Sequence, residues 1–127
     1  MYQHKLPYKS KPERQIAGLL DRYNIPFIYE KPTAVVDGGH TKLWHPDFTL
    51  AHGPIIEYFG INGDQSYRDR TAHKMKVYEQ NQFELIPLFP PNMRGPWQNY
   101  LLSRIDAALE NRLTDYRSRT FSQGARF

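Results

Sequence analysis

Two acidic residues, Asp47 and Glu57, stand ten positions apart on either side of a turn signal. Short apolar runs at 48–50 and 54–59 flank the Ala-His-Gly loop at 51–53, an arrangement typical of a β-hairpin. With that loop, paired positions have numbers that add up to 104, so Asp47 lies opposite Glu57 with Cβ atoms roughly 5 Å apart. Two carboxylates this close repel each other at neutral pH, and such a pair usually shares a proton or binds a divalent cation. We expect a cation here.

The residues around the two acids read His45-Pro46-Asp47-Phe48 and, after the turn, Ile55-Ile56-Glu57-Tyr58. They resemble the PD-(D/E)XK motif of the restriction-endonuclease-like nucleases, and the resemblance covers roughly residues 10–90. It implies that Asp47 and Glu57 hold catalytic Mg²⁺, with Mn²⁺ as a substitute. It also implies that the backbone carbonyl of Tyr58 is a further oxygen ligand.

The motif places a lysine two residues after its second acid, and this chain has Phe59 there. Because some branches of the family carry the lysine on the following helix, the resemblance points to Lys74 or Lys76. The two side chains are turned about 200° from each other around a helix, so only one can face the acids. Lys74 shares a face with Tyr78, four residues on, which reads as a core residue. We therefore expect Lys74 to be the catalytic lysine.

A helix is expected over residues 11–23, because Ser10-Lys11-Pro12-Glu13 forms a Ser-x-x-Glu capping box with proline in the first turn. The Glu13 carboxylate then has two open roles. As a cap, it reaches back to the backbone N–H of Ser10. In the family, an acid on this first helix often approaches the metal pair, which would make Glu13 a third ligand or a water-orienting base. One rotamer cannot serve both roles at once.

The remaining elements follow from periodicity and turn residues. Strands are expected at 25–33 and at 83–89. Another strand is expected to begin at 34–36, meet an Asp-Gly-Gly turn, and resume from residue 43. Helices are expected at 65–80 and from 97 to about 113. The order αβββαβα indicates an α/β fold, and the resemblance implies a restriction-endonuclease-like core with a mixed sheet of about four strands flanked by helices.

The length of 127 residues predicts a single domain spanning residues 1–127. Residues 1–9 are expected to be an extended arm and residues 114–127 a basic, flexible tail. There are no cysteines, which excludes a disulfide framework and thiolate metal sites. No apolar run reaches the roughly 20 residues needed to span a bilayer, so we expect a soluble, cytoplasmic protein without a membrane partner.

A net charge of +4 favours a polyanionic partner, and we expect that partner to be DNA. The candidate contacts to nucleic acid are Arg68, Arg70 and Lys76 on the second helix and Arg117 and Arg119 in the tail. Two other interpretations stay open. The helix cations could form a solvated face, and a terminal tail is ordinarily frayed.

The sequence thus predicts a Mg²⁺-dependent DNA endonuclease that is structure-selective or nonspecific. The alternative is a catalytically inactive nucleic-acid-binding module of the same fold, which Phe59 favours and the facing carboxylates oppose. The sequence leaves open a resolvase, a nicking repair enzyme, or the cutting subunit of a larger transposition or phage machine. It equally leaves open a homodimer or a subunit of a larger nucleoprotein complex.

Overall fold

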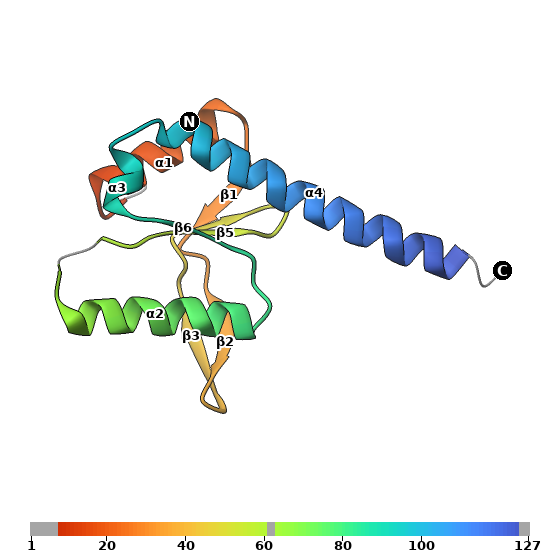
Figure 1. The fold of residues 1–127 in the computed structure, drawn as a ribbon, viewed down its shortest axis with the longest axis horizontal. Coiled ribbons are helices and arrows are strands. Elements are labelled where there is room, and N and C mark those ends of the chain that lie inside the picture. The colour runs from red at the N-terminus through yellow and green to blue at the C-terminus, as the bar shows by residue number, and fades with distance from the viewer. Residues whose placement is uncertain (1–7, 61–62, 125–127) are drawn as a thin grey trace.

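The computed structural model describes residues 8–60 and 63–124, with side chains up to residue 118. Figure 1 shows these residues as a sheet between helices, with one long helix extending away from the body. The helices are α1 (Lys11–Arg22), α2 (Gln65–Gln80), α3 (Pro90–Met93) and α4 (Trp97–Gly124). The strands are β1 (Phe27–Tyr29), β2 (Thr33–Asp37), β3 (His40–Trp44), β4 (Phe48–Leu50), β5 (Ile55–Tyr58) and β6 (Leu85–Leu88).

Four strands form a mixed sheet in the order β1-β4-β5-β6. β1 and β4 pair antiparallel, as do β4 and β5, whereas β6 runs parallel to β5 after the crossover through α2. The partners Phe48 with Ile56 and Thr49 with Ile55 confirm the predicted hairpin register. Pro87 lies in β6, which is an edge strand of this sheet, so its missing N–H falls where a strand can tolerate proline.

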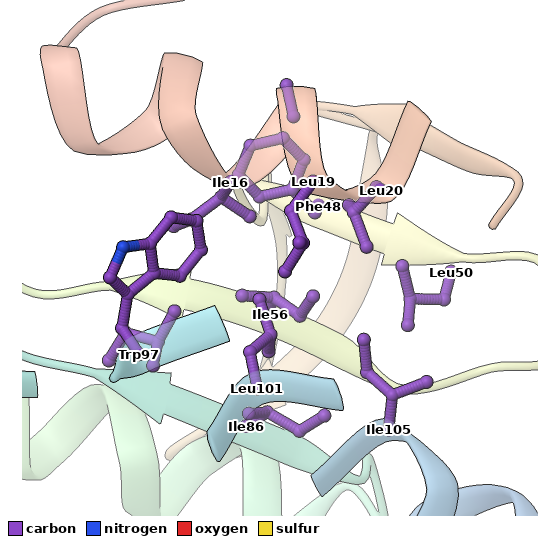
Figure 2. Packing of buried hydrophobic residues seen from close by; sticks show 12 residues of the cluster. Ile16, Leu19, Leu20, Phe48, Leu50, Ile56, Ile86, Trp97, Leu101 and Ile105 are labelled. Atoms are coloured by element: carbon purple, nitrogen blue, oxygen red, sulfur yellow. The ribbon is translucent and has the colours of Figure 1, made fainter. Parts of the chain in front are cut away.

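The main hydrophobic core lies between the sheet and the layer formed by α1 and α4 (Figure 2). Ile16 and Leu20 of α1, Phe48 and Ile56 of the sheet, and Leu101 of α4 are all fully buried. Because side chains alternate along a strand, the neighbours of Ile56 point to the opposite face. That face is covered by α2, which lies across the sheet from α1 and α4 (Figure 1).

The strands β2 and β3 pair only with each other and form a separate hairpin beside α2. The amide side chain of Asn81, just after α2, accepts a hydrogen bond from the Val36 backbone N–H at 2.9 Å and donates one to the Val36 carbonyl at 3.0 Å. Val35 on the same strand is buried. The hairpin is therefore fastened to the end of α2 rather than to the main sheet.

This hairpin corrects the expected order αβββαβα, since five strands rather than three lie between α1 and α2. The extended stretch breaks at His45 and Pro46, so β3 and β4 belong to different sheets. The mixed four-stranded sheet and the α/β class are as expected. The expected helix over residues 65–80 is confirmed, and the one over 11–23 ends one residue earlier, at Arg22.

The last helix is longer than expected, because α4 continues through Gly124 rather than ending near residue 113, and so runs into the expected tail at 114–127. No proline or glycine interrupts residues 97–123. A helix already formed over several turns extends without a new nucleation cost. At the other end, residues 1–7 of the expected arm lie outside the described part. Tyr8 packs edge-on against Tyr29 with ring centres 4.6 Å apart.

Within the described residues, no helix combines the length and the apolar character that a membrane span requires.

Candidate active site

The β4–β5 hairpin brings Asp47 and Glu57 together, as their spacing predicts. The Asp47 backbone N–H donates a hydrogen bond to Glu57 Oε1 at 3.0 Å, and the Tyr58 backbone N–H donates one to Asp47 Oδ2 at 2.8 Å. Each carboxylate is thus held by the backbone beside the other. The loop that closes the hairpin ends at Gly53, whose φ of +117° is a conformation that favours glycine.

Burial and the neighbouring Glu57 carboxylate raise the pKa of Asp47 to about 8. The Glu57 side chain is 2% exposed, so water screens the repulsion between the two groups poorly. A proton or a cation must therefore compensate the pair at neutral pH.

The helix α2 contributes two side chains to the same carboxylate oxygen. Lys74 Nζ lies 2.6 Å from Glu57 Oε2, and the Tyr78 hydroxyl donates a hydrogen bond to that atom at 2.9 Å. The two residues are four positions apart, so they share one face of the helix. The expected inward orientation of Lys74 is what the structure has. Burial, followed by the charge of Glu57, raises the pKa of Tyr78 far above its ordinary value, so the phenol remains a donor.

Aromatic rings surround the ammonium group of Lys74. Its Nζ lies 5.9 Å from the ring centre of Phe59 and 5.9 Å from that of Trp44, within the range of cation–π attraction. Phe59 is buried and stacks on Phe89 with ring centres 5.6 Å apart. By strand alternation, position 59 points to the same face as Glu57. The ammonium of Lys74 thus lies beside the position where the PD-(D/E)XK motif has its lysine.

Glu13 is buried on α1 and is held by a tyrosine. The Ser10 hydroxyl caps the helix by accepting a hydrogen bond from the Glu13 backbone N–H at 3.2 Å, while the Glu13 carboxylate accepts a hydrogen bond from the Tyr29 hydroxyl. The Glu13 charge also contributes to the raised pKa of Asp47, although less than burial and Glu57 do. Glu13 therefore lies within electrostatic range of Asp47, and its catalytic role stays a prediction.

The donor set of the site consists of carboxylate oxygens. Among the residues that the structure describes, no group of three or more His, Cys, Asp or Glu side chains is arranged to hold a metal. Mg²⁺ is usually bound by one or two carboxylates and completes its shell with water and substrate phosphates. Asp47 and Glu57 fit that requirement, whereas the nitrogen and sulfur ligands that Zn²⁺ prefers are not assembled here. The Tyr58 carbonyl stays a predicted additional ligand.

Arg68 and Arg70, two expected contacts to nucleic acid, both make hydrogen bonds at the start of α2. The Arg68 guanidinium donates to the Gly63 carbonyl at 2.6 Å, which fastens the segment before the helix. Arg70 donates to the Ser66 hydroxyl at 2.8 Å. Both side chains are exposed, so they can exchange these partners for phosphates.

The other expected contacts lie farther from the acids. Lys76 is exposed on a different side of α2 from Lys74, as helical geometry predicts. Arg117 is exposed on α4, and the side chain of Arg119 lies outside the described residues. The roles of all these residues in nucleic-acid binding stay predictions.

Sequence reasoning assigned no role in the site to Tyr78, Trp44 or Tyr29. The sequence predicts Tyr78 as a core residue, and its ring is buried. Only its spacing of four from Lys74 indicates that both side chains contact the same group. Trp44 stands three residues before Asp47, a position that carries no local signal of its own. Tyr29 meets Glu13 through the tertiary fold, across sixteen positions of sequence.

No family model, curated protein or solved structure matches this chain.

Proposed function

We propose that this protein is a Mg²⁺-dependent DNA endonuclease with a restriction-endonuclease-like core, acting on DNA by structure or without sequence preference. The observation that carries the proposal is the grouping of Asp47, Glu57 and Lys74. Asp47, just before β4, and Glu57 of β5 are joined by backbone hydrogen bonds, and the Lys74 ammonium lies 2.6 Å from Glu57. A divalent cation held by carboxylates can promote phosphodiester hydrolysis, and an adjacent lysine can stabilise the charge that develops on the phosphoryl oxygens.

In this function, Asp47 and Glu57 would hold the ion and Lys74 would donate to the phosphate. A bound Mg²⁺ would lower the pKa of a water ligand and neutralise charge on the scissile phosphate. Tyr78 keeps Glu57 oriented through its hydrogen bond. Lys74 carries the one ammonium described beside Glu57 Oε2, and it is positioned to stabilise the charge that develops on the phosphoryl oxygens.

Cleavage assays with four substrates test the proposal. Supercoiled plasmid, linear duplex, single strand and four-way junction are incubated with Mg²⁺ or with EDTA, using the full chain and its Asp47→Ala variant. We expect the wild type to cut at least one substrate in Mg²⁺. We expect no cutting in EDTA and no cutting by Asp47→Ala. Cleavage that persists in Asp47→Ala would remove the carboxylate pair from the mechanism. Symmetric cutting of the junction alone would identify a resolvase and imply a dimer.

The inactive binding module is the second candidate, and Phe59 at the motif's lysine position is the observation that favours it. Titration calorimetry with Mn²⁺ in the absence of DNA separates the two functions. If the protein is a nuclease, a cation must bind the wild type and not Asp47→Ala. If it is the inactive module, no cation needs to bind. DNA binding without cation binding or cleavage would support the inactive module.

A further inference from the structure

Beside the carboxylates, the β2–β3 hairpin and α2 border an open groove of about 700 Å³. Its walls include Lys42 and Trp44 of β3, His45 just after that strand, and Arg70, His73 and Lys74 of α2. The helix residues recur at spacings of three and four, so one face of α2 forms a whole wall. A volume of this size is in the range of small-ligand sites.

The groove is continuous with the proposed active site. Lys74 belongs to both, since its Nζ lies 2.6 Å from Glu57 and it also lines the groove. Only two residues separate Trp44 from Asp47, and three residues of extended chain span at most about 10 Å. A short segment of one polynucleotide strand can therefore reach both the indole ring and the carboxylates.

Charge in the groove favours a polyanion. The groove is lined by the cations Lys42, Arg70 and Lys74, by the imidazoles of His45 and His73, and by the acids Asp37 and Asp69. Asp37 is already compensated, because Lys42 Nζ and His73 Nε2 lie 3.0 Å and 2.9 Å from its Oδ2. Asp69 accepts a hydrogen bond from the side-chain amide of Gln65 at 2.8 Å. The lining therefore carries three fixed positive charges against two negative ones, with Lys42 paired to Asp37 and Lys74 paired to Glu57 of the adjoining site.

Trp44 supplies an aromatic surface in this cationic setting. Tyr78 packs edge-on against it, with ring centres 5.3 Å apart and planes at 83°, and this contact fixes the indole. Trp44 is half-buried and lines the groove. A rigid aromatic ring among phosphate-binding cations is the combination by which proteins hold unpaired bases. A duplex buries the faces of its bases by stacking and offers a side chain only their edges.

We propose that this groove binds an unpaired nucleotide next to the scissile phosphate, with Trp44 as its stacking surface. The preferred substrate is then a nucleic acid with a single-stranded segment, such as a flap, a tail or an open branch point. This inference rests on the proposed function, because it places the groove beside the bond that is cut. It names the substrate class that the nuclease site leaves open.

Tryptophan fluorescence reports directly on this groove. The chain has two tryptophans, and Trp97 is 8% exposed within the core. The full-length Asp47→Ala variant in EDTA is titrated with a short oligothymidylate and with a blunt duplex of equal length. Affinities are read from the anisotropy of labelled DNA. We expect the single strand to quench the emission and to bind at least about tenfold more tightly than the duplex, the effect of one stacked base. Equal affinity and equal quenching by the duplex would overturn the proposal.

Substitutions in the same Asp47→Ala background locate the effect. Trp44→Ala should lose about tenfold in affinity for the single strand, whereas Trp44→Phe, which keeps a ring, should stay within about threefold. Tyr116→Ala removes an exposed aromatic residue outside the groove and should change little. Unchanged affinity in Trp44→Ala would contradict the stacking role.

A second variant covers the case in which Trp44→Ala does not fold. Lys42 is about half exposed, so Lys42→Ala should fold normally. Loss of one phosphate contact should make the slope of log affinity against log salt shallower by about 0.7 for a single strand. An unchanged slope would place the strand outside the groove.

Two results separate this inference from the proposed function. Binding that depends on Trp44, without cleavage of any substrate, would support the groove and count against the nuclease. Efficient cleavage of blunt duplex that is indifferent to Trp44→Ala would support the nuclease and overturn the groove.

Discussion

The ammonium nitrogen of Lys74 lies 5.9 Å from the centre of the Phe59 ring. Phe59, the residue just after β5, stands where the resemblance to the PD-(D/E)XK motif would place a lysine, and Lys74 comes from α2. The ammonium of Lys74 therefore lies beside position 59, although it is supplied by a different element of the fold. Under the proposed function, this relationship can be tested by removing the ammonium group at position 74 and introducing one at position 59.

Lys74→Ala should lower the rate of cleavage by about two orders of magnitude, the usual effect of removing one donor to a transition state. Metal binding should remain nearly intact, because the carboxylates are unchanged. Adding Phe59→Lys to this variant should restore part of the rate, since strand alternation points position 59 toward Glu57. Single-turnover cleavage and calorimetry measure the two effects.

Lys76→Ala is the matched control for this experiment, because it removes the same charge from another side of α2. It should cost only a weaker, salt-dependent affinity for DNA. An inactive Lys76→Ala beside an active Lys74→Ala would show that the wrong lysine has been chosen. If neither substitution matters, an arginine of the same helix becomes the candidate donor.

Removal of either carboxylate should abolish both metal binding and turnover. Asp47→Ala and Glu57→Ala each remove one of the two carboxylates that would hold the ion, so the cation loses half of its proposed side-chain ligands. Calorimetric titration with Mn²⁺ and plasmid cleavage measure the two losses. Glu79→Ala, which removes an exposed acid at the end of α2, is the control and should retain both. Normal Mn²⁺ binding by Asp47→Ala would contradict the proposed ligands.

Without metal, Asp47 should make the protein less stable as pH rises. Its pKa is about 8 in the folded chain against an ordinary value of 3.8. Between these values the folded state binds more protons than the unfolded state, so the free energy of unfolding falls with pH until about 8. Asp47→Asn should remove this contribution and be more stable than the wild type at pH about 8.

Urea denaturation in EDTA across this range measures the difference between wild type and Asp47→Asn. Asp69→Asn is the control, because Asp69 is exposed on α2, and it should follow the wild type. In the wild type, Mg²⁺ should bind more tightly as pH rises toward 8, because the ion competes with the proton on Asp47. If the difference in unfolding free energy between wild type and Asp47→Asn is the same at pH 8 as at pH 5, the raised pKa of Asp47 is contradicted.

The core prediction concerns α4, whose first half is packed and whose second half extends away from the body (Figure 1). Leu101→Ala should cost about 2–5 kcal/mol of unfolding free energy, because Leu101 is fully buried and its truncation leaves a cavity. Leu113→Ala removes the same atoms from a side chain that is 37% exposed, so it should cost much less. Urea denaturation of both variants makes the comparison, and equal losses would show that the packing of α4 differs from the structure.

Local patterns in the sequence were enough to predict the parts of the site that depend on them. The Ala-His-Gly turn determines the register of β4 and β5, and that register places Asp47 opposite Glu57. The spacing of Lys74 and Tyr78 on α2 gives the orientation of the lysine. These relationships depend on residues close in sequence or on a fixed helical period, which one chain is sufficient to reveal.

Features that depend on tertiary contacts could not be predicted in this way. The position of the β2–β3 hairpin beside α2 depends on Asn81, which bonds Val36 across 45 positions of sequence. The hydrogen bond from Tyr29 to Glu13 likewise requires the fold to be known. The extension of α4 past residue 113 was missed because the amphipathic pattern fades there, although nothing in the sequence breaks the helix.

Lys74 and Tyr78 both reach the single atom Oε2 of Glu57 from one face of α2. The effect of an inserted residue on the site therefore depends on its position in α2. A residue inserted before Lys74 displaces only the first turns, since Val77 and Tyr78 remain docked and the spacing of four is kept. A residue inserted between Lys74 and Tyr78 turns the lysine by about 100° around the helix axis and removes its ammonium from the carboxylates. The last turns of α2 therefore cannot change in length without separating Lys74 from Glu57.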